Sequence, residues 1–228
     1  MTAPTRRAAA RNGLRTDVDE TARHHRLGRS LDTLFPEPRC ALDFRTPFEL
    51  LVATVLSAQS TDVGVNRVTP ALFARFPDAA AMAAVEPDDL VPFIRSVGLY
   101  NHKARALVGL ARCLVASRDG VVPDRLEDLI ALPGVARKTA NVVLQNAFGI
   151  VEGFVVDTHV ARLAGRLGLS GGRTPEAIER DLMQVFPRSE WARRSHQLIL
   201  HGRGHCDARR PRCGACPLAP DCPGRSEP

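Results

Sequence analysis

Residues 126–148 read LEDLIALPGVARKTANVVLQNAF, a pattern that predicts two helices joined by a tight turn. The first helix should end near Ala131, because Pro133 and Gly134 favour a turn. The second helix has one apolar face, made by Val135, Thr139, Val142, Val143 and Phe148. A turn that opens a helix leaves backbone N–H groups at the positive end of the helix dipole, where an anion can bind. The pattern fits two interpretations, an anion site of this kind or an ordinary pair of packed helices.

The second helix contains Lys138, an unusual residue for this chain. Of the 31 Lys and Arg residues only Lys103 and Lys138 are lysines, so a position that needed charge alone would be expected to hold arginine. A cation in the first turn of a helix opposes the helix dipole, which favours the neutral amine. A neutral lysine, unlike arginine, is a nucleophile that forms Schiff bases. Lys138 is therefore predicted to have a chemical role or, alternatively, to be a solvated surface lysine. Lys103 is interpreted as a surface residue, at most a phosphate contact.

Asp157 lies in the sequence VVDTHVARLAGRLG, about 19 residues after Lys138. It precedes a predicted helix, where aspartate is a common N-cap that stabilises the helix by about 1 kcal/mol. Alternatively, its carboxylate deprotonates or orients an incoming nucleophile and stabilises a developing cationic sugar, with Val155 and Val156 excluding water from it. Sequence spacing alone does not bring Asp157 beside Lys138.

Helical periodicity continues through most of the chain and predicts an all-α fold. Apolar stripes at helical spacing cover residues 47–56, 61–75, 87–96, 102–117, 124–131, 135–147, 158–167, 175–186 and 189–202. Only the run FVV at 154–156 resembles a strand, and it is too short to build a sheet. Residues 1–26 are rich in charge, lack a sustained apolar pattern and are predicted to form a mobile basic arm.

The composition limits the class of protein. With 228 residues, 44% of them hydrophobic, the chain can bury the core of one large domain or two small ones. It has no run of about 18 apolar residues and no apolar segment near the N-terminus, which argues against a membrane span and a secretion signal. We therefore expect a cytoplasmic protein. The formal charge of +6 and the pI of about 9.4 favour a polyanionic partner such as nucleic acid.

Four of the six cysteines lie close together near the C-terminus, in the pattern C-x6-C-x2-C-x5-C. They are Cys206, Cys213, Cys216 and Cys222. In a cytoplasmic protein such a cluster is predicted to bind metal rather than to form disulfides. The pattern fits an iron–sulfur cluster or a zinc ion, the latter with His205 as an alternative ligand. The loop between the first two cysteines also contains Arg209, Arg210 and Arg212. Metal binding would make this loop a rigid cationic surface for a phosphate backbone.

Four elements of the sequence, in order, resemble the endonuclease III family of helix-hairpin-helix DNA glycosylases. They are LPGVARKTANVVL, VDTHVARL, ILHGRGHC and the cysteine pattern, which in this family binds a [4Fe-4S] cluster. The resemblance covers residues from about 27 to 222. It implies a two-domain all-α protein, with a six-helix barrel at 40–150 and a discontinuous iron–sulfur cluster domain made of 27–39 and 151–228. The implied partner of this monomer is double-stranded DNA that contains damaged bases or abasic sites, and the implied location is the bacterial nucleoid.

The resemblance also implies roles for individual residues. Lys138 matches the nucleophile that attacks the sugar C1′ and forms a Schiff base, which permits β-elimination, and Asp157 matches the aspartate that assists it. Gly134 and Ala136 match hairpin positions whose amides bind phosphate. Gln59, in LLVATVLSAQSTDV, and Leu99, in SVGLYNHK, match residues that fill the gap left by a flipped nucleotide. From the sequence alone, without the resemblance, Leu99 would be assigned to the core.

The chain departs from the family pattern at three places. Ala136 stands where the hairpin usually has glycine, and the loop GIVEGFVVD lacks a proline and is one residue longer. Ile130 stands where a polar residue is expected near the lesion, and an apolar side chain cannot hydrogen-bond the edge of an oxidised pyrimidine.

The presence of both Lys138 and Asp157 favours a bifunctional glycosylase and abasic-site lyase. Two alternatives remain at the level of sequence. One is a monofunctional mismatch or adenine glycosylase, which is expected to lack the lysine. The other is a DNA-binding iron–sulfur protein without catalytic activity.

Overall fold

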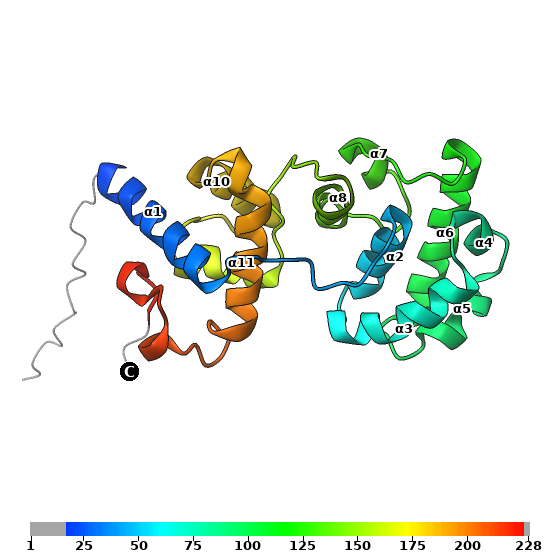
Figure 1. The fold of residues 1–228 in the computed structure, drawn as a ribbon, viewed down its shortest axis with the longest axis horizontal. Helices are drawn as coiled ribbons and strands as arrows, with labels where there is room; N and C mark the ends of the chain where they lie inside the picture. Colours follow the sequence, from blue (N-terminus) through cyan, green and yellow to red (C-terminus); the bar gives the residue numbers. More distant parts are fainter. Residues whose placement is uncertain (1–16, 226–228) are drawn as a thin grey trace, which may run out of the picture.

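All regular structure in residues 17–225, the part of the chain that the computed structural model describes, is helical (Figure 1). The prediction of an all-α fold is therefore confirmed. The run 154–156 forms no strand, and its three side chains are buried instead. None of the helices in the described range is long and apolar enough to cross a membrane.

The buried apolar side chains form two separate clusters. The first, which we call the first core, extends from Leu42 to Leu144. Its helices are α2 (Pro47–Ser57), α3 (Asp62–Arg75), α4 (Ala79–Ala83), α5 (Pro87–Ile94), α6 (Tyr100–Arg118), α7 (Leu126–Ile130), α8 (Arg137–Val143) and the π-helical turn Leu144–Phe148. Helix α2 lies at its centre, since nine consecutive residues from Phe48 to Leu56 are buried. Thr46 begins this helix by accepting a hydrogen bond from the backbone N–H of Glu49 at 3.1 Å.

The second core contains residues from both ends of the described chain. It extends from Leu27 and Leu31 in the N-terminal helix to Leu218. Its elements are α1 (Asp17–Leu34), α9 (Thr158–Arg166), α10 (Pro175–Val185), α11 (Trp191–Gly204) and the short 3-10 turns Arg188–Glu190, Cys213–Ala215 and Ala219–Asp221. Figure 1 shows α1, α10 and α11 at one end of the molecule and α3 to α6 at the other.

The prediction that residues 1–26 form a mobile arm is wrong for the last ten of these residues. Helix α1 already begins at Asp17, and the side chain of Arg23 is only 3% exposed. The Arg23 guanidinium donates hydrogen bonds to the carbonyl oxygens of Leu167 at 2.6 Å and Gly168 at 3.1 Å. These partners are more than 140 positions away, so the local sequence pattern could not indicate them. The rest of the predicted arm, residues 1–16, lies outside the described residues.

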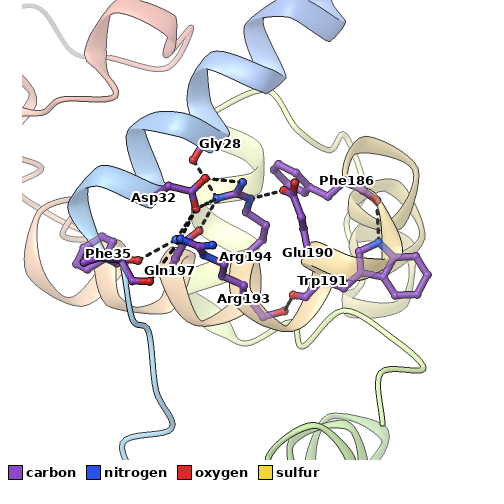
Figure 2. Close-up of polar contacts among 11 residues, drawn as sticks. Gly28, Asp32, Phe35, Phe186, Glu190, Trp191, Arg193, Arg194 and Gln197 are labelled. Carbon is purple, nitrogen blue, oxygen red and sulfur yellow. Dashed lines mark hydrogen bonds and ion pairs between the residues drawn. The ribbon is translucent and has the colours of Figure 1, made fainter. Parts of the chain in front are cut away.

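A buried arginine, Arg194, joins α1 to α11 (Figure 2). Its guanidinium binds both oxygens of Asp32, at 2.7 and 3.1 Å, and the carbonyl oxygen of Gly28 at 2.9 Å. It also binds Glu190 and Gln197, each at 2.7 Å. The neighbouring Arg193 reaches the same Asp32 at 2.9 Å from a side chain that is 44% exposed.

These two adjacent arginines provide a matched test of what holds the second core together. We expect Arg194→Met to lower the free energy of unfolding by about 3 kcal/mol, because it removes a buried guanidinium from its ion pairs with Asp32 and Glu190. Arg193→Met should lower the free energy of unfolding by less than about 1 kcal/mol, because water screens an exposed ion pair. Urea denaturation of both variants measures the difference. If both variants lost the same free energy of unfolding, burial of Arg194 would not determine its contribution to stability.

Candidate active site

A cleft lies between the two cores. Two adjoining pockets share five residues, Ser57, Asp62, Lys138, Asp157 and Arg203, which we take to define the cleft. An ion pair crosses it, with Nη2 of Arg203 2.7 Å from Oδ2 of Asp62. A larger groove of about 810 Å³ lies between α1 and α10, but none of the sequence-predicted site residues lines it.

Lys138 enters the cleft from the hairpin between α7 and α8. Its side chain is exposed at the second position of α8, and Ala136 is the N-cap residue of that helix. Gly134 has φ 75°, and a Cβ there would lie 3.0 Å from Cβ of Ala106. The turn therefore requires glycine at 134. Ala136 has φ −89°, which any residue adopts, so this departure from the family pattern leaves the hairpin backbone unstrained.

Asp157 faces the same cleft and is also an N-cap. Its Oδ1 accepts hydrogen bonds from the backbone N–H groups of His159 and Val160, both at 2.8 Å. Its other oxygen, Oδ2, makes no hydrogen bond with any residue that the structure describes. The two sequence interpretations of Asp157 are thus compatible, because one oxygen fixes the carboxylate and the other is free to act.

An interaction that sequence analysis missed fixes the orientation of α8. Glu179 of α10 is buried, and its carboxylate binds Nε of Arg137 at 2.8 Å and Nδ2 of Asn141 at 3.2 Å. A Cβ at Gly153 would collide with Oε1 of Glu179, so a side chain at this position would displace the carboxylate from its contacts with α8. Because Arg137 precedes Lys138, this contact from the second core positions the lysine.

Gln59 and Leu99 both have a left-handed backbone, with φ 55° and 60°. Within residues 17–225 only one other non-glycine residue, Asp119, has a positive φ. Such a conformation costs of order 1–3 kcal/mol and persists where surrounding contacts impose it. Leu99 is 59% exposed, so assigning it to the core would be wrong. The two loops lie side by side, because a Cβ at Gly98 would be 3.4 Å from the carbonyl oxygen of Gln59. Gln59 also lines the cleft beside Lys138.

The pocket next to Lys138 has a largely apolar wall with one half-buried imidazole. Leu42, Val142, Val155, Ile199 and Leu200 form that wall. Burial lowers the pKa of His196, whose Nδ1 lies 3.0 Å from the carbonyl oxygen of Ala192. The neutral ring therefore donates from Nδ1 and leaves Nε2 as an acceptor. Ile130, at the end of α7, is 40% exposed and lines neither pocket of the cleft.

The second lysine does not lie where sequence analysis placed it. Lys103 is 4% exposed, and its Nζ donates to the carbonyl oxygen of Leu56 at 2.7 Å. A buried ammonium group in this position cannot contact a phosphate, so the interpretation of Lys103 as a surface residue or phosphate contact is wrong. Its partner is 47 positions away, which explains why no local pattern indicated its burial.

The four clustered cysteines line one small cavity, together with His201 and the apolar side chains of Leu163 and Leu218. All four are free. Nη1 of Arg166 lies 3.2 Å from Sγ of Cys206, and Nε2 of His201 lies 3.5 Å from Sγ of Cys216. Burial raises the pKa of both Cys216 and Cys222.

In residues 17–225, no group of three His, Cys, Asp or Glu side chains is arranged to hold a single metal ion. Four sulfurs around one cavity, with cationic and N–H groups beside them, nevertheless fit a multi-iron cluster. His205 does not line the cavity, and its ring stacks on His201 with centroids 5.3 Å apart.

The arginine loop is accessible. Arg209, Arg210 and Arg212 are exposed, and none forms an ion pair with another side chain of the described range. Oδ1 of Asp207 accepts hydrogen bonds from the backbone N–H groups of Arg209 at 2.9 Å and Arg210 at 3.3 Å. The side chain of Asp207 thus orders the loop backbone, while the three arginine side chains remain exposed.

Comparison with known proteins gives matches over most of the chain. The profile of the HhH-GPD superfamily of base excision DNA repair proteins matches residues 52–188. Endonuclease III of Synechocystis sp. is 53% identical over 193 residues, which cover 85% of this chain and 88% of that protein. Endonuclease III of Escherichia coli K12 is 44% identical over 181 residues, or 79% of this chain and 85% of that protein.

Solved structures agree with the sequence matches. The trapped covalent intermediate of an endonuclease III with DNA has a TM-score of 0.83 at 43% identity, and covers 88% of this chain and 93% of its own. A thermostable thymine-DNA glycosylase has a TM-score of 0.77 at 20% identity, over 90% of this chain and 97% of its own, and shows likeness of fold alone.

Proposed function

Because the chain belongs to the endonuclease III family within the HhH-GPD superfamily of base excision DNA repair proteins, we propose that the cleft of Lys138 and Asp157 is its active site. The protein is a DNA glycosylase and abasic-site lyase that acts as a monomer on damaged DNA. The observation that carries the assignment is that both predicted catalytic side chains line the same two pockets, although they lie beside different cores. A DNA-binding module without activity would not need this arrangement.

In the proposed reaction the neutral amine of Lys138 attacks C1′ of the damaged nucleotide. The bond between C1′ and the base breaks, and the base leaves with the bonding electrons. Opening of the sugar ring gives a Schiff base between C1′ and Nζ, and loss of a proton from C2′ then expels the 3′ phosphate by β-elimination. Asp157, held by its Oδ1, uses Oδ2 to accept the amine proton and to stabilise the cationic sugar.

DNA is proposed to lie across the cleft with the hairpin on its backbone. The backbone N–H groups of Gly134 and Ala136 make no hydrogen bond within the described residues and can donate to a phosphate. Gln59 and Leu99 fill the gap left by the flipped nucleotide, and we call them the gap-filling residues. Arg209, Arg210 and Arg212 add sequence-independent phosphate contacts. Because its substrate is DNA, the protein is proposed to be located in the cytoplasm of a bacterium, at the nucleoid.

We infer that the base pocket takes an oxidised pyrimidine. Its apolar wall suits a small ring, and Nε2 of the half-buried His196 is an acceptor for an N–H group of the base. Ile130 lies outside this pocket, so its apolar side chain leaves these contacts unchanged.

We also propose that Cys206, Cys213, Cys216 and Cys222 hold a [4Fe-4S] cluster. When bound, the cluster supplies a redox-active centre, and its ligands connect the arginine loop to the second core. The common cavity and the N–H groups that Arg166 and His201 present to sulfur support this assignment.

Borohydride reduction tests the nucleophile, because it converts a Schiff base into a stable covalent adduct. Wild-type protein should form an adduct with duplex DNA that contains an abasic site, whereas Lys138→Ala and Lys138→Arg should form none. The arginine variant retains the cation, so its failure separates a nucleophile from a phosphate contact. Adducts from both variants would assign the chemistry to another amine.

Asp157→Asn separates catalysis from helix capping. Asparagine caps a helix about as well as aspartate, so the melting temperature should stay within error of the wild type. The rate of adduct formation should fall by about 10²–10⁴-fold, the contribution of a general acid or base. As a comparison, Asp157→Ala should lose the activity and about 1 kcal/mol of stability as well. An Asn variant with full activity would leave Asp157 a structural cap only.

The metal content distinguishes the two centres that the cysteine pattern allows. Purified wild-type protein should be brown and contain about four iron atoms and four sulfides per chain. Cys216→Ser should lose this iron, and Cys113→Ser, at an exposed cysteine of the first core's α6, should keep it. A colourless folded protein with one zinc per chain would contradict the assignment.

A further inference from the structure

Lys103 is a buried cation that the proposed mechanism does not use. Its Nζ donates hydrogen bonds to the carbonyl oxygen of Leu56 at 2.7 Å and to Oγ of Ser60 at 3.0 Å. Leu56 lies in the last turn of α2, so the ammonium group lies at the negative end of that helix's dipole. Lys103 itself lies in the first turn of α6. The side chain therefore joins the beginning of α6 to the end of α2.

The site suits lysine rather than arginine. Lys103 forms no ion pair with a described carboxylate, and burial lowers its pKa from the ordinary value. A compact ammonium group reaches two oxygens in a narrow space, whereas a planar guanidinium is larger and holds its donors in a fixed fork. Burial of a charge is unfavourable unless hydrogen bonds compensate for the lost water, and here two oxygens accept from the ammonium group. In a chain that otherwise uses arginine, these contacts account for the second lysine.

Lys103 contacts the loops of both gap-filling residues. Its backbone N–H donates to the carbonyl oxygen of Leu99 at 3.0 Å. Its side chain binds Ser60, the neighbour of Gln59. Each loop has an unfavourable left-handed residue, at Gln59 and at Leu99, and such a conformation persists only while surrounding contacts impose it. Lys103 contacts both loops, the Gln59 loop through its side chain and the Leu99 loop through its backbone.

We propose that Lys103 is a positioning residue, which holds Gln59 and Leu99 at the separation needed to enter the gap left by a flipped nucleotide. The proposal rests on the proposed function of the gap-filling residues. Without the ammonium group the Gln59 loop loses its connection to α6, and the two side chains no longer enter the DNA as a pair. Phosphate contacts at the hairpin are unaffected, because they lie on α8 and the turn before it.

Binding to a stable abasic analogue tests this without any chemistry. The measured quantity is the Kd for an undamaged duplex divided by the Kd for the same duplex with one tetrahydrofuran site, which cannot form a Schiff base. Lys103→Met should lower this ratio about 10-fold, because it removes two hydrogen bonds from a charged donor. Ser60→Ala, which removes one acceptor, should lower it about 3-fold. In a Leu99→Ala background Lys103→Met should have little further effect on the ratio.

Arg112 offers a matched control on the same helix. Its guanidinium binds the carbonyl oxygens of Ala83 at 3.2 Å and Val85 at 2.9 Å, the same kind of contact at a distance from the gap-filling residues. Arg112→Met is expected to leave the ratio unchanged even where it lowers the melting temperature.

The outcomes separate a positioning role from a structural one. If Lys103→Met weakens binding to both duplexes by the same factor, the lysine only stabilises the fold and the proposal is wrong. If that variant does not fold, an unchanged ratio in Ser60→Ala overturns the proposal and a lowered ratio supports it. Failure of the proposed catalytic function is recognised separately, because the borohydride adduct, rather than this ratio, reports on Lys138.

Discussion

The buried carboxylate of Glu179 is the constraint on which the cleft depends. Lys138 is presented by a helix of the first core and Asp157 by a loop of the second, so their alignment requires a fixed contact between the two. Glu179 supplies it by binding Arg137 and Asn141 on the helix that carries the lysine. A buried carboxylate must be paired, so any shift of α8 leaves an unpaired charge. Gly153 is part of the same constraint, since a Cβ there would overlap the carboxylate and displace it.

The roles proposed for the two lysines share a physical explanation, since arginine would not serve in either. As the proposed nucleophile, Lys138 must be able to lose its proton, and in its proposed positioning role Lys103 fits a compact charge against the end of a helix. The role of the first could be proposed from composition and dipole alone. The role of the second could not, because nothing in LYNHKARAL indicates that its lysine turns inward.

The local sequence therefore predicted the helices better than the contacts that join distant segments of the chain. Helical periodicity and N-cap residues are local, and they predicted the all-α fold and helices such as α3 and α9. The five-residue α4 was missed, because so short a segment shows no periodic face. Contacts that connect distant segments, such as those of Arg23, Lys103 and Glu179, carry no local pattern. The exposure of Leu99 was also invisible to hydropathy, since its left-handed backbone is what turns it outward.

The N-terminal helix closes on the C-terminal segment of the described chain. Arg23 binds the carbonyl oxygen of Asp221 at 3.2 Å, and Arg26 pairs with the carboxylate of the same residue at 2.7 Å. The second core is thus built from segments that precede and follow the first core in the sequence. During synthesis the first core can assemble as soon as residues 42–144 have left the ribosome, while Arg23 of α1 is separated from its first distant partners, Leu167 and Gly168, by 144 and 145 positions. All four cysteines of the proposed cluster follow residue 205, so the cluster can be completed only after the hairpin that carries Lys138 has been synthesised.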